Sequence, residues 1–145
     1  MPDGTDPLDQ LNAELDGAEN PFGEVIYAYT RAQALEDGEQ VDVSTVAREA
    51  GIKFPTFLTR AVWVQYVEVP PGVECQDEQG RLWDIVWMLH HAIRSQPRDT
   101  DRITFALYVR NTNGSAKLVS LKAMVGAVDI KNPDPAITVM MPDED

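Results

Sequence analysis

Cysteine is nearly absent from the 145-residue chain, in which Cys75 is the one thiol. A single cysteine cannot close an intramolecular disulfide, so a disulfide-stapled scaffold is excluded. The acidic residues Glu74, Asp77 and Glu78 stand close by in the sequence. Because neighbouring carboxylates disfavour the thiolate, we expect this cysteine to be a bystander and not a nucleophile.

Long apolar runs are also missing, and the longest fall far short of the roughly 18 residues that a membrane span needs. The start of the chain, MPDGTDPLDQ, lacks the basic and apolar regions of a secretory signal. Glycine-rich phosphate loops and dinucleotide-binding fingerprints do not occur either. These absences predict a cytoplasmic protein that has no membrane contact and needs no cofactor.

Basic residues are scarce and unevenly placed. The chain has 12 Lys and Arg against 24 Asp and Glu, which gives a formal net charge of -12. Residues 1–24 hold seven acids and no base, the last three residues are all acidic, and residues 25–142 carry 14 acids and all 12 bases. Without a basic stripe to neutralise phosphates, direct binding to nucleic acid is not expected.

The acidic charge leaves two interpretations open. Acidic ends can keep a protein soluble, or a strongly acidic small protein can mimic nucleic acid and inhibit a host defence system by occupying a basic groove. We favour solubilising ends, because the excess charge sits in the ends and not along the body. Residues 1–20 are therefore expected to form an acidic disordered tail, and residues 21–145 a single α+β domain.

Short elements are predicted at the start of the domain. The run EVIYAY, residues 24–29, suits a strand because it is β-branched and aromatic. Thr30 and Gln33 fit the capping box of a short helix, since each side chain can accept a hydrogen bond from the other residue's amide. A second short helix is expected over residues 45–50, with Ser44 as its N-cap.

The segment TFLTRAVWVQYVEV, residues 56–69, fits helical spacing and strand alternation equally well. We favour a helix up to Tyr66. The longest predicted helix covers residues 81–95, and its apolar stripe recurs at spacings of four, three and four. This stripe consists of Leu82, Val86, Leu89 and Ile93. Asp77 can cap the start of that helix.

The last third of the chain alternates apolar and polar residues, which is the strand period. Residues 103–109 and 117–125 flank an Asn-Gly pair, a strong hairpin signal, and residues 136–141 supply a third strand. Helices first and strands afterwards predict an α+β fold. We expect N-terminal short helices and one long amphipathic helix to pack on a C-terminal antiparallel sheet of three to four strands.

The long helix carries both histidines of the chain, His90 and His91. Adjacent helix residues point about 100° apart, so the two imidazoles cannot converge on one ion. A zinc site would also need further Cys or His ligands, so no metal is expected. Asp84 lies seven residues before His91 on the same helical face, and an acid–base pair of these two residues is an open alternative.

A second stripe on this helix carries Trp83, Trp87, His90 and Arg94. The two stripes together make the helix apolar over more than half its circumference, which is typical of burial on two sides. We favour burial of the second stripe against the segment around Trp63. The alternative is an exposed patch for a protein partner, since Trp, Tyr and Arg are the usual hot-spot residues. The candidate binding residues are Trp63, Tyr66, Trp83, Trp87, His91 and Arg94.

Five blocks of sequence occur together in this chain: GEVIYAYTRAQALEDG, VDVSTVAREAGIKFP, LTRAVW, DEQGRLWDIVWML and PAITVMMPDED. With them the chain resembles a family of uncharacterised small proteins encoded on bacterial plasmids and integrative conjugative elements. The resemblance spans residue 22 to the C-terminus. It implies a bacterial cytoplasmic setting and a mobile-element context, and it brings no activity, cofactor or catalytic residue.

The expected function is that of a non-catalytic accessory protein of a mobile genetic element, acting by protein–protein binding. One alternative is a small enzyme that uses Asp84 and His91 in a cleft. Another is the acidic mimic of DNA that inhibits a host defence system. The sequence specifies neither the partner protein nor the oligomeric state.

Overall fold

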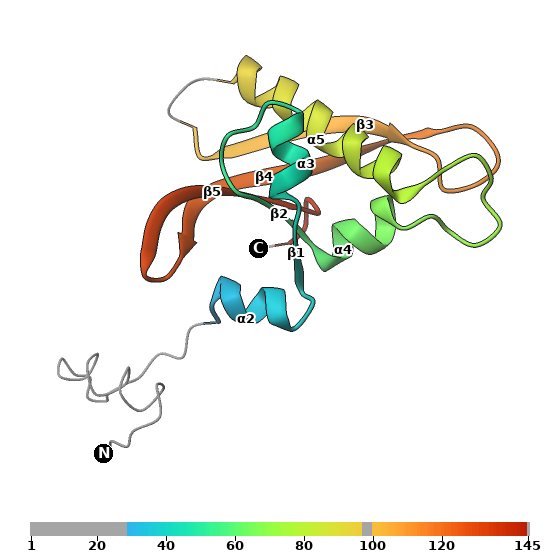
Figure 1. The fold of residues 1–145 in the computed structure, drawn as a ribbon. Helices are drawn as coiled ribbons and strands as arrows, with labels where there is room; N and C mark the ends of the chain where they lie inside the picture. The colour runs from blue at the N-terminus through green and yellow to red at the C-terminus, as the bar shows by residue number, and fades with distance from the viewer. Residues whose placement is uncertain (1–28, 97–99, 145) are drawn as a thin grey trace.

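The structure, a computed structural model, describes residues 29–96 and 100–144 and shows an α+β fold (Figure 1). The predicted tail over residues 1–20 lies outside the described residues, as does the predicted strand at residues 24–29 apart from Tyr29. The helices are α2 (Arg31–Glu36), α3 (Ser44–Glu49), α4 (Arg60–Val62), the π-helix η1 (Trp63–Val67) and α5 (Glu78–Ser95). The strands are β1 (Gln40–Asp42), β2 (Thr56–Thr59), β3 (Arg102–Val109), β4 (Lys117–Asp129) and β5 (Asn132–Met140).

The strands form one mixed sheet in the order β1-β2-β5-β4-β3. Within it, β3, β4 and β5 make the antiparallel meander that the sequence predicts, with Phe105 opposite Leu121 and Ala123 opposite Val139. The helices α3 and α5 pack on one side of the sheet, while α2 lies away from them, beyond the β2 and β5 strands (Figure 1).

The sheet is larger than the three to four antiparallel strands that we expected, because two strands of the N-terminal half join it. β2 pairs in parallel with β5, with Phe57 opposite Thr138, and β1 pairs antiparallel with β2. The predicted helix up to Tyr66 is therefore wrong over residues 56–59 and begins only at Arg60. Because β2 is buried on both faces, it lacks the alternation that marks a half-exposed strand.

The two short helices differ in how they begin. At α2 the capping box is confirmed: the Thr30 hydroxyl accepts from the amide of Gln33 at 3.1 Å, and the Gln33 side chain accepts from the amide of Thr30. At α3 the predicted cap is wrong. Val43 occupies the cap position, and the Ser44 hydroxyl instead accepts from the amide of Thr56 at 2.9 Å. This bond joins the start of α3 to β2.

Arg31 attaches α2 to the sheet. Its guanidinium donates to the Thr138 hydroxyl at 3.0 Å and to the Gln40 side chain at 2.8 Å, and its Cζ atom lies 4.1 Å from the centre of the Phe57 ring. The Asp129 carboxylate accepts from the first amides of α2, which is a favourable place for a negative charge. These contacts involve β1, β2, β4 and β5, so α2 is fixed to four strands.

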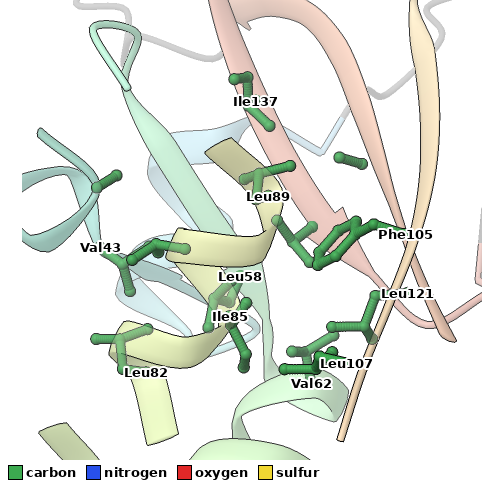
Figure 2. Close-up of a cluster of buried hydrophobic side chains, with 14 of the residues drawn as sticks. Val43, Leu58, Val62, Leu82, Ile85, Leu89, Phe105, Leu107, Leu121 and Ile137 are labelled. Atoms are coloured by element: carbon green, nitrogen blue, oxygen red, sulfur yellow. The ribbon is translucent and has the colours of Figure 1, made fainter. Parts of the chain in front are cut away.

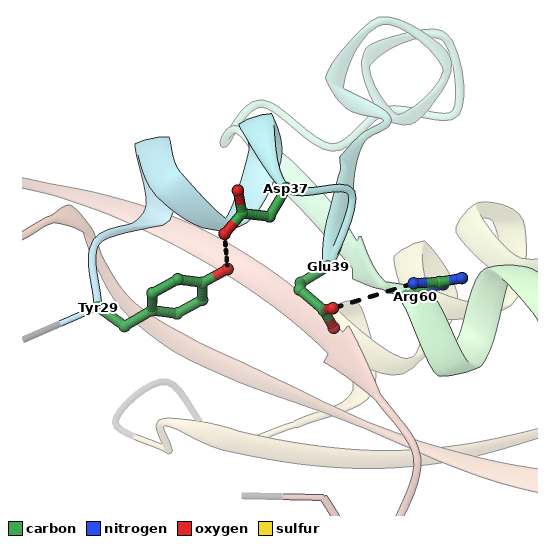
Figure 3. Close-up of polar contacts among 4 residues, drawn as sticks. All are labelled: Tyr29, Asp37, Glu39 and Arg60. Carbon is green, nitrogen blue, oxygen red and sulfur yellow. Dashed lines mark hydrogen bonds and ion pairs between the residues drawn. The ribbon is translucent and has the colours of Figure 1, made fainter.

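Two exposed polar contacts lie at the same end of the molecule (Figure 3). The Tyr29 hydroxyl donates to Asp37 at 2.7 Å and joins the two ends of α2. The Arg60 guanidinium lies 4.0 Å from the Glu39 carboxylate, between solvent-exposed side chains. An exposed ion pair of this kind contributes about 0–1 kcal/mol to the free energy of unfolding, so the Arg60–Glu39 pair has little effect on the stability of the fold.

The helix predicted over residues 81–95 is confirmed by α5. The Asp77 side chain caps it by accepting from the amide of Gly80 at 2.6 Å. Leu82, Val86 and Leu89 are buried, and Ile93 packs partly buried at the edge of the same core. Figure 2 shows Leu82 and Leu89 of α5 among core side chains that come from the strands and from the α3 region. The helix thus covers the sheet with one face and leaves the other free to carry a site.

Candidate functional site

The outer side of α5 carries a cluster of four rings, which we call the tryptophan–histidine cluster: Trp83, Trp87, His90 and His91. The Trp83 and Trp87 rings stack with centroids 5.7 Å apart, and the His91 ring meets Trp87 edge-on at 4.8 Å. Both arrangements are favoured geometries for aromatic pairs. The expected burial of this stripe holds for Trp83, which packs partly buried against the core, and fails for Trp87, which is 41% exposed.

His90 is the member of the cluster that contacts the end of α3, and it is partly buried. A Cβ atom at Gly51 would lie 2.9 Å from Cε1 of His90, so the imidazole rests directly on the backbone at the end of α3. This contact explains why glycine is needed there, in addition to its φ of +104°. His91 and Arg94, by contrast, are exposed to solvent.

The candidate binding residues of η1 face the protein interior. Trp63 and Tyr66 are both partly buried and pack against the core. The structure therefore splits the six predicted residues: Trp83, Trp87 and His91 form one cluster, Arg94 lies exposed further along α5, and the two η1 residues serve mainly as packing. The Tyr66 side chain also lines a separate hollow beside α5.

That hollow measures about 270 Å³ and lies between the first half of α5 and the end of β3. Its lining residues are Tyr66, Gln76, Arg81, Asp84, Leu107, Tyr108, Val109, Arg110 and Ala116. Asp84 thus faces the hollow, while His91 does not belong to its lining. The predicted acid–base pair therefore does not come together in this hollow.

Arg81 belongs to the lining of this hollow, although it is only 5% exposed. Its guanidinium donates to the carbonyls of Tyr66 at 3.0 Å and Arg110 at 2.8 Å, and to the side chains of Gln76 at 3.1 Å and Asn111 at 2.6 Å. All four acceptors are neutral. One of them is a terminal carbonyl of η1, where the helix dipole favours a cation.

The open edge of β3 explains how Arg81 reaches the strand. The amide of Val125 donates to the carbonyl of Asp101 at 2.9 Å, so the odd-numbered residues of β3 bond to β4 and the even-numbered ones face away. Arg110 continues this alternation one residue past the strand, and its carbonyl is free to accept from Arg81. In the described part of the chain no strand pairs with this edge.

Arg110 itself lies beside the hollow. Its guanidinium donates to the carbonyls of Thr112 at 3.0 Å and Glu74, and to the Asn113 side chain at 3.4 Å. Burial lowers the pKa of Arg81, and the nearby charge of Arg110 lowers it further. Among the described residues, neither guanidinium has a carboxylate within ion-pair distance.

Asp84 has an unusual carboxyl group for an exposed position. Burial of its carboxyl beside the hollow raises its pKa above the ordinary value. The lining of the hollow therefore combines two guanidiniums with one carboxyl group.

The two arginines were missed by reasoning from the sequence, although one signal was present. Arg81 precedes the buried residues Ile85 and Leu89 by four and eight positions, so it continues an apolar stripe. It also stands near the helix start, where the dipole disfavours a cation. A cation on an apolar stripe and near a helix start is unfavourable on both counts, so its presence indicates that specific hydrogen-bond acceptors hold it. Arg110 gives no such signal, because only the fold brings it near Arg81.

Within residues 29–96 and 100–144, no three side chains of His, Cys, Asp or Glu gather closely enough to hold a metal ion. None of the described helices is both long and apolar enough for a membrane span.

These features define the chain as a small α+β protein that carries an aromatic cluster on one helix and a hollow bordered by two arginines at a sheet edge. The chain belongs to DUF6573, a family of unknown function, whose match covers residues 19–145. No curated protein and no solved structure matches the chain.

Proposed function

We propose that the protein is a non-catalytic accessory protein that binds another protein through the tryptophan–histidine cluster. The observation that carries this proposal is the 41% exposure of Trp87, which stacks on Trp83 and against His91. A large apolar ring held rigid at the surface loses little conformational freedom on binding, which is why such rings are interface hot spots.

The surroundings of Trp87 fit this role. Met88, the next residue, is 37% exposed, and methionine adapts its shape to a partner surface. His91 and Arg94 supply polar groups at the margin, as in the rim of a typical interface. A complementary partner surface would offer an apolar recess with acidic residues beside it.

The setting of the proposal comes from the sequence resemblance. We place the protein in the bacterial cytoplasm as a product of a plasmid or an integrative conjugative element, and its partner among host or plasmid proteins. The enzyme alternative has less support, because His91 is not among the residues that line the hollow beside Asp84.

The test is affinity capture from the native host with the wild type, Trp87→Ala and Ile130→Ala. Ile130 is an equally suitable apolar truncation, since it is 59% exposed and lies on the β4–β5 turn, away from the cluster. We expect a partner, identified by mass spectrometry, that binds the wild type and Ile130→Ala and is lost from Trp87→Ala. Loss of about 2 kcal/mol of binding free energy or more would mark Trp87 as a hot spot. Equal capture by all three proteins would refute the proposed surface.

A further inference from the structure

Arg81 and Arg110 present two positive charges to one hollow in a chain that is rich in acids. The chain has 24 Asp and Glu but only 12 Lys and Arg, so a carboxylate partner for each arginine would be easy to provide. Instead, both guanidiniums are held by neutral carbonyl and amide oxygens. Two adjacent cations repel each other unless an anion lies between them. Their charge is therefore available to a ligand.

The hydrogen-bond donors of the two guanidiniums are not all used. A guanidinium has five N–H groups. Arg81 makes four bonds, through Nε, twice through Nη1, and once through Nη2. Arg110 makes three, two through Nη1 and one through Nη2. Counting acceptors among the described residues, one N–H of Arg81 and two of Arg110, including Nε, remain for a ligand.

We propose that this hollow is a binding site for an oxyanion, a phosphate or carboxylate group, with Arg110 as the direct ligand and the buried Arg81 as the second charge. The fork of a guanidinium suits such oxyanions, which accept two parallel hydrogen bonds. Arg81 is held by four acceptors before any ligand arrives, so it needs no reordering on binding. The volume of about 270 Å³ suits a small molecule or the end group of a larger one.

Asp84 is the remaining charged residue of the lining. Tyr108 also borders the hollow, but strand alternation places its side chain, which is 67% exposed, on the face of β3 opposite the buried Leu107 and Val109. Asp84 faces the same space, and its carboxylate repels an anion. Removal of the Asp84 charge should therefore strengthen anion binding.

The test is an NMR titration of the whole chain that follows the Nε–H signals of its arginines. Inorganic phosphate is added in one series and succinate in another, with sodium chloride adjusted to keep the ionic strength constant. We expect saturable shifts at Arg110 and Arg81. The phosphate and succinate series distinguish recognition of a phosphate from recognition of a carboxylate, and saturable binding in either series supports the site.

Three variants make the result specific. Arg110→Gln should weaken binding about tenfold, the usual effect of losing one charge-assisted hydrogen bond. Asp84→Asn should strengthen it about two- to fivefold, because a like charge is removed. Arg60→Gln is the matched control, an exposed arginine beside Glu39 and away from the hollow, and it should change nothing.

Three outcomes would overturn the proposal. The first is the absence of a saturable shift with both anions. The second is a response of similar size at Arg60 and Arg94, and the third is equal affinities in the wild type and Asp84→Asn, because either result would indicate general attraction of anions. Asp84→Asn keeps the test valid even if Arg110→Gln fails to fold. The outcome is independent of the tryptophan–histidine cluster, which shares no residue with this site.

Discussion

At the scale of single residues, Leu89 tests the core under α5 most directly. Its side chain is 0% exposed, whereas the adjacent Met88 is 37% exposed on the same helix. Leu89→Ala should lower the free energy of unfolding by about 2–5 kcal/mol, because it removes buried methyl groups and leaves a cavity. Met88→Ala should stay within about 0.5 kcal/mol. Urea denaturation of both variants measures the difference, and a loss below about 0.5 kcal/mol for Leu89→Ala would exclude it from the core.

The carboxyl group of Asp84 should make the free energy of unfolding depend on pH. Its folded-state pKa is raised by burial, so the ionised carboxylate costs stability at neutral pH, and this cost disappears as the pH falls through the raised pKa toward the ordinary value. Asp84→Asn should therefore be slightly more stable than the wild type at pH 7, by no more than about 0.5 kcal/mol because solvent screens the group. The gain should vanish below the ordinary pKa. A variant that is less stable at pH 7 would contradict this assignment.

The residues of the two candidate sites were predictable to different degrees. Trp83 and Trp87 could be placed together because helical spacing alone brings them to one side. Their exposure could not be predicted, since it depends on where η1 and α3 pack. The hollow joins Arg81 to Arg110 across 29 positions of sequence, and no local pattern reports such a contact.

At the scale of elements, the junction between α3 and α5 depends on Gly51. Its φ of +104° is one that residues with side chains rarely adopt, and an added Cβ would lie 2.9 Å from His90. Gly51→Ala should therefore lower the free energy of unfolding by more than the roughly 1–2 kcal/mol expected for the backbone alone. Gly72→Ala is the matched control, because Gly72 has a φ of +83° and no neighbour within 4 Å of its Cβ position.

A double-mutant cycle separates the two causes at Gly51. Adding His90→Ala to Gly51→Ala should recover the part of the loss that comes from contact with the imidazole, and leave the backbone part. Thermal and urea unfolding of the four proteins measure the coupling. Additive effects, with Gly51→Ala no worse than Gly72→Ala, would show that the imidazole does not rest on this backbone.

The elements themselves were predicted well where a local signal was strong. The capping box of Thr30 and the apolar stripe of α5 each identify a helix without reference to the rest of the chain. The sequence predicts a helix over the four residues of β2, because apolar residues at helical spacing follow them directly. Its strand character comes from the pairing of Thr56–Leu58 with Ile137–Val139, a contact between segments about 80 positions apart. Tertiary pairing of this kind overrides local propensity.

At the scale of the whole molecule, the mixed sheet depends on that parallel contact. β5 is the central strand of the sheet and β2 lies next to it, and β1 and α2 are attached through these two strands. The α+β class follows from the order of helices and strands along the chain. The number of strands does not, because β1 is only three residues long and has no pattern of its own.

The charge of the whole chain leads to the last prediction. Removing residues 1–20 deletes six acids and no base, and changes the formal net charge from -12 to -6. If the acidic end only promotes solubility, the shortened chain should unfold with a free energy within about 0.5 kcal/mol of the full chain. The family match begins at residue 19, so nearly all of the deleted segment lies outside it.

Partner binding discriminates between the two roles of this charge. A protein captured through Trp87 should bind the full and the shortened chain with equal affinity. Its binding should weaken only modestly between low and high salt, because the apolar contact is not screened and only the charged rim is. A DNA mimic would instead lose affinity on deletion, and its binding would fall steeply as salt increases. Titration of the captured partner against both chains at two ionic strengths measures this. Salt-sensitive binding that requires residues 1–20 would show that the partner binds the acidic end and not the surface of α5.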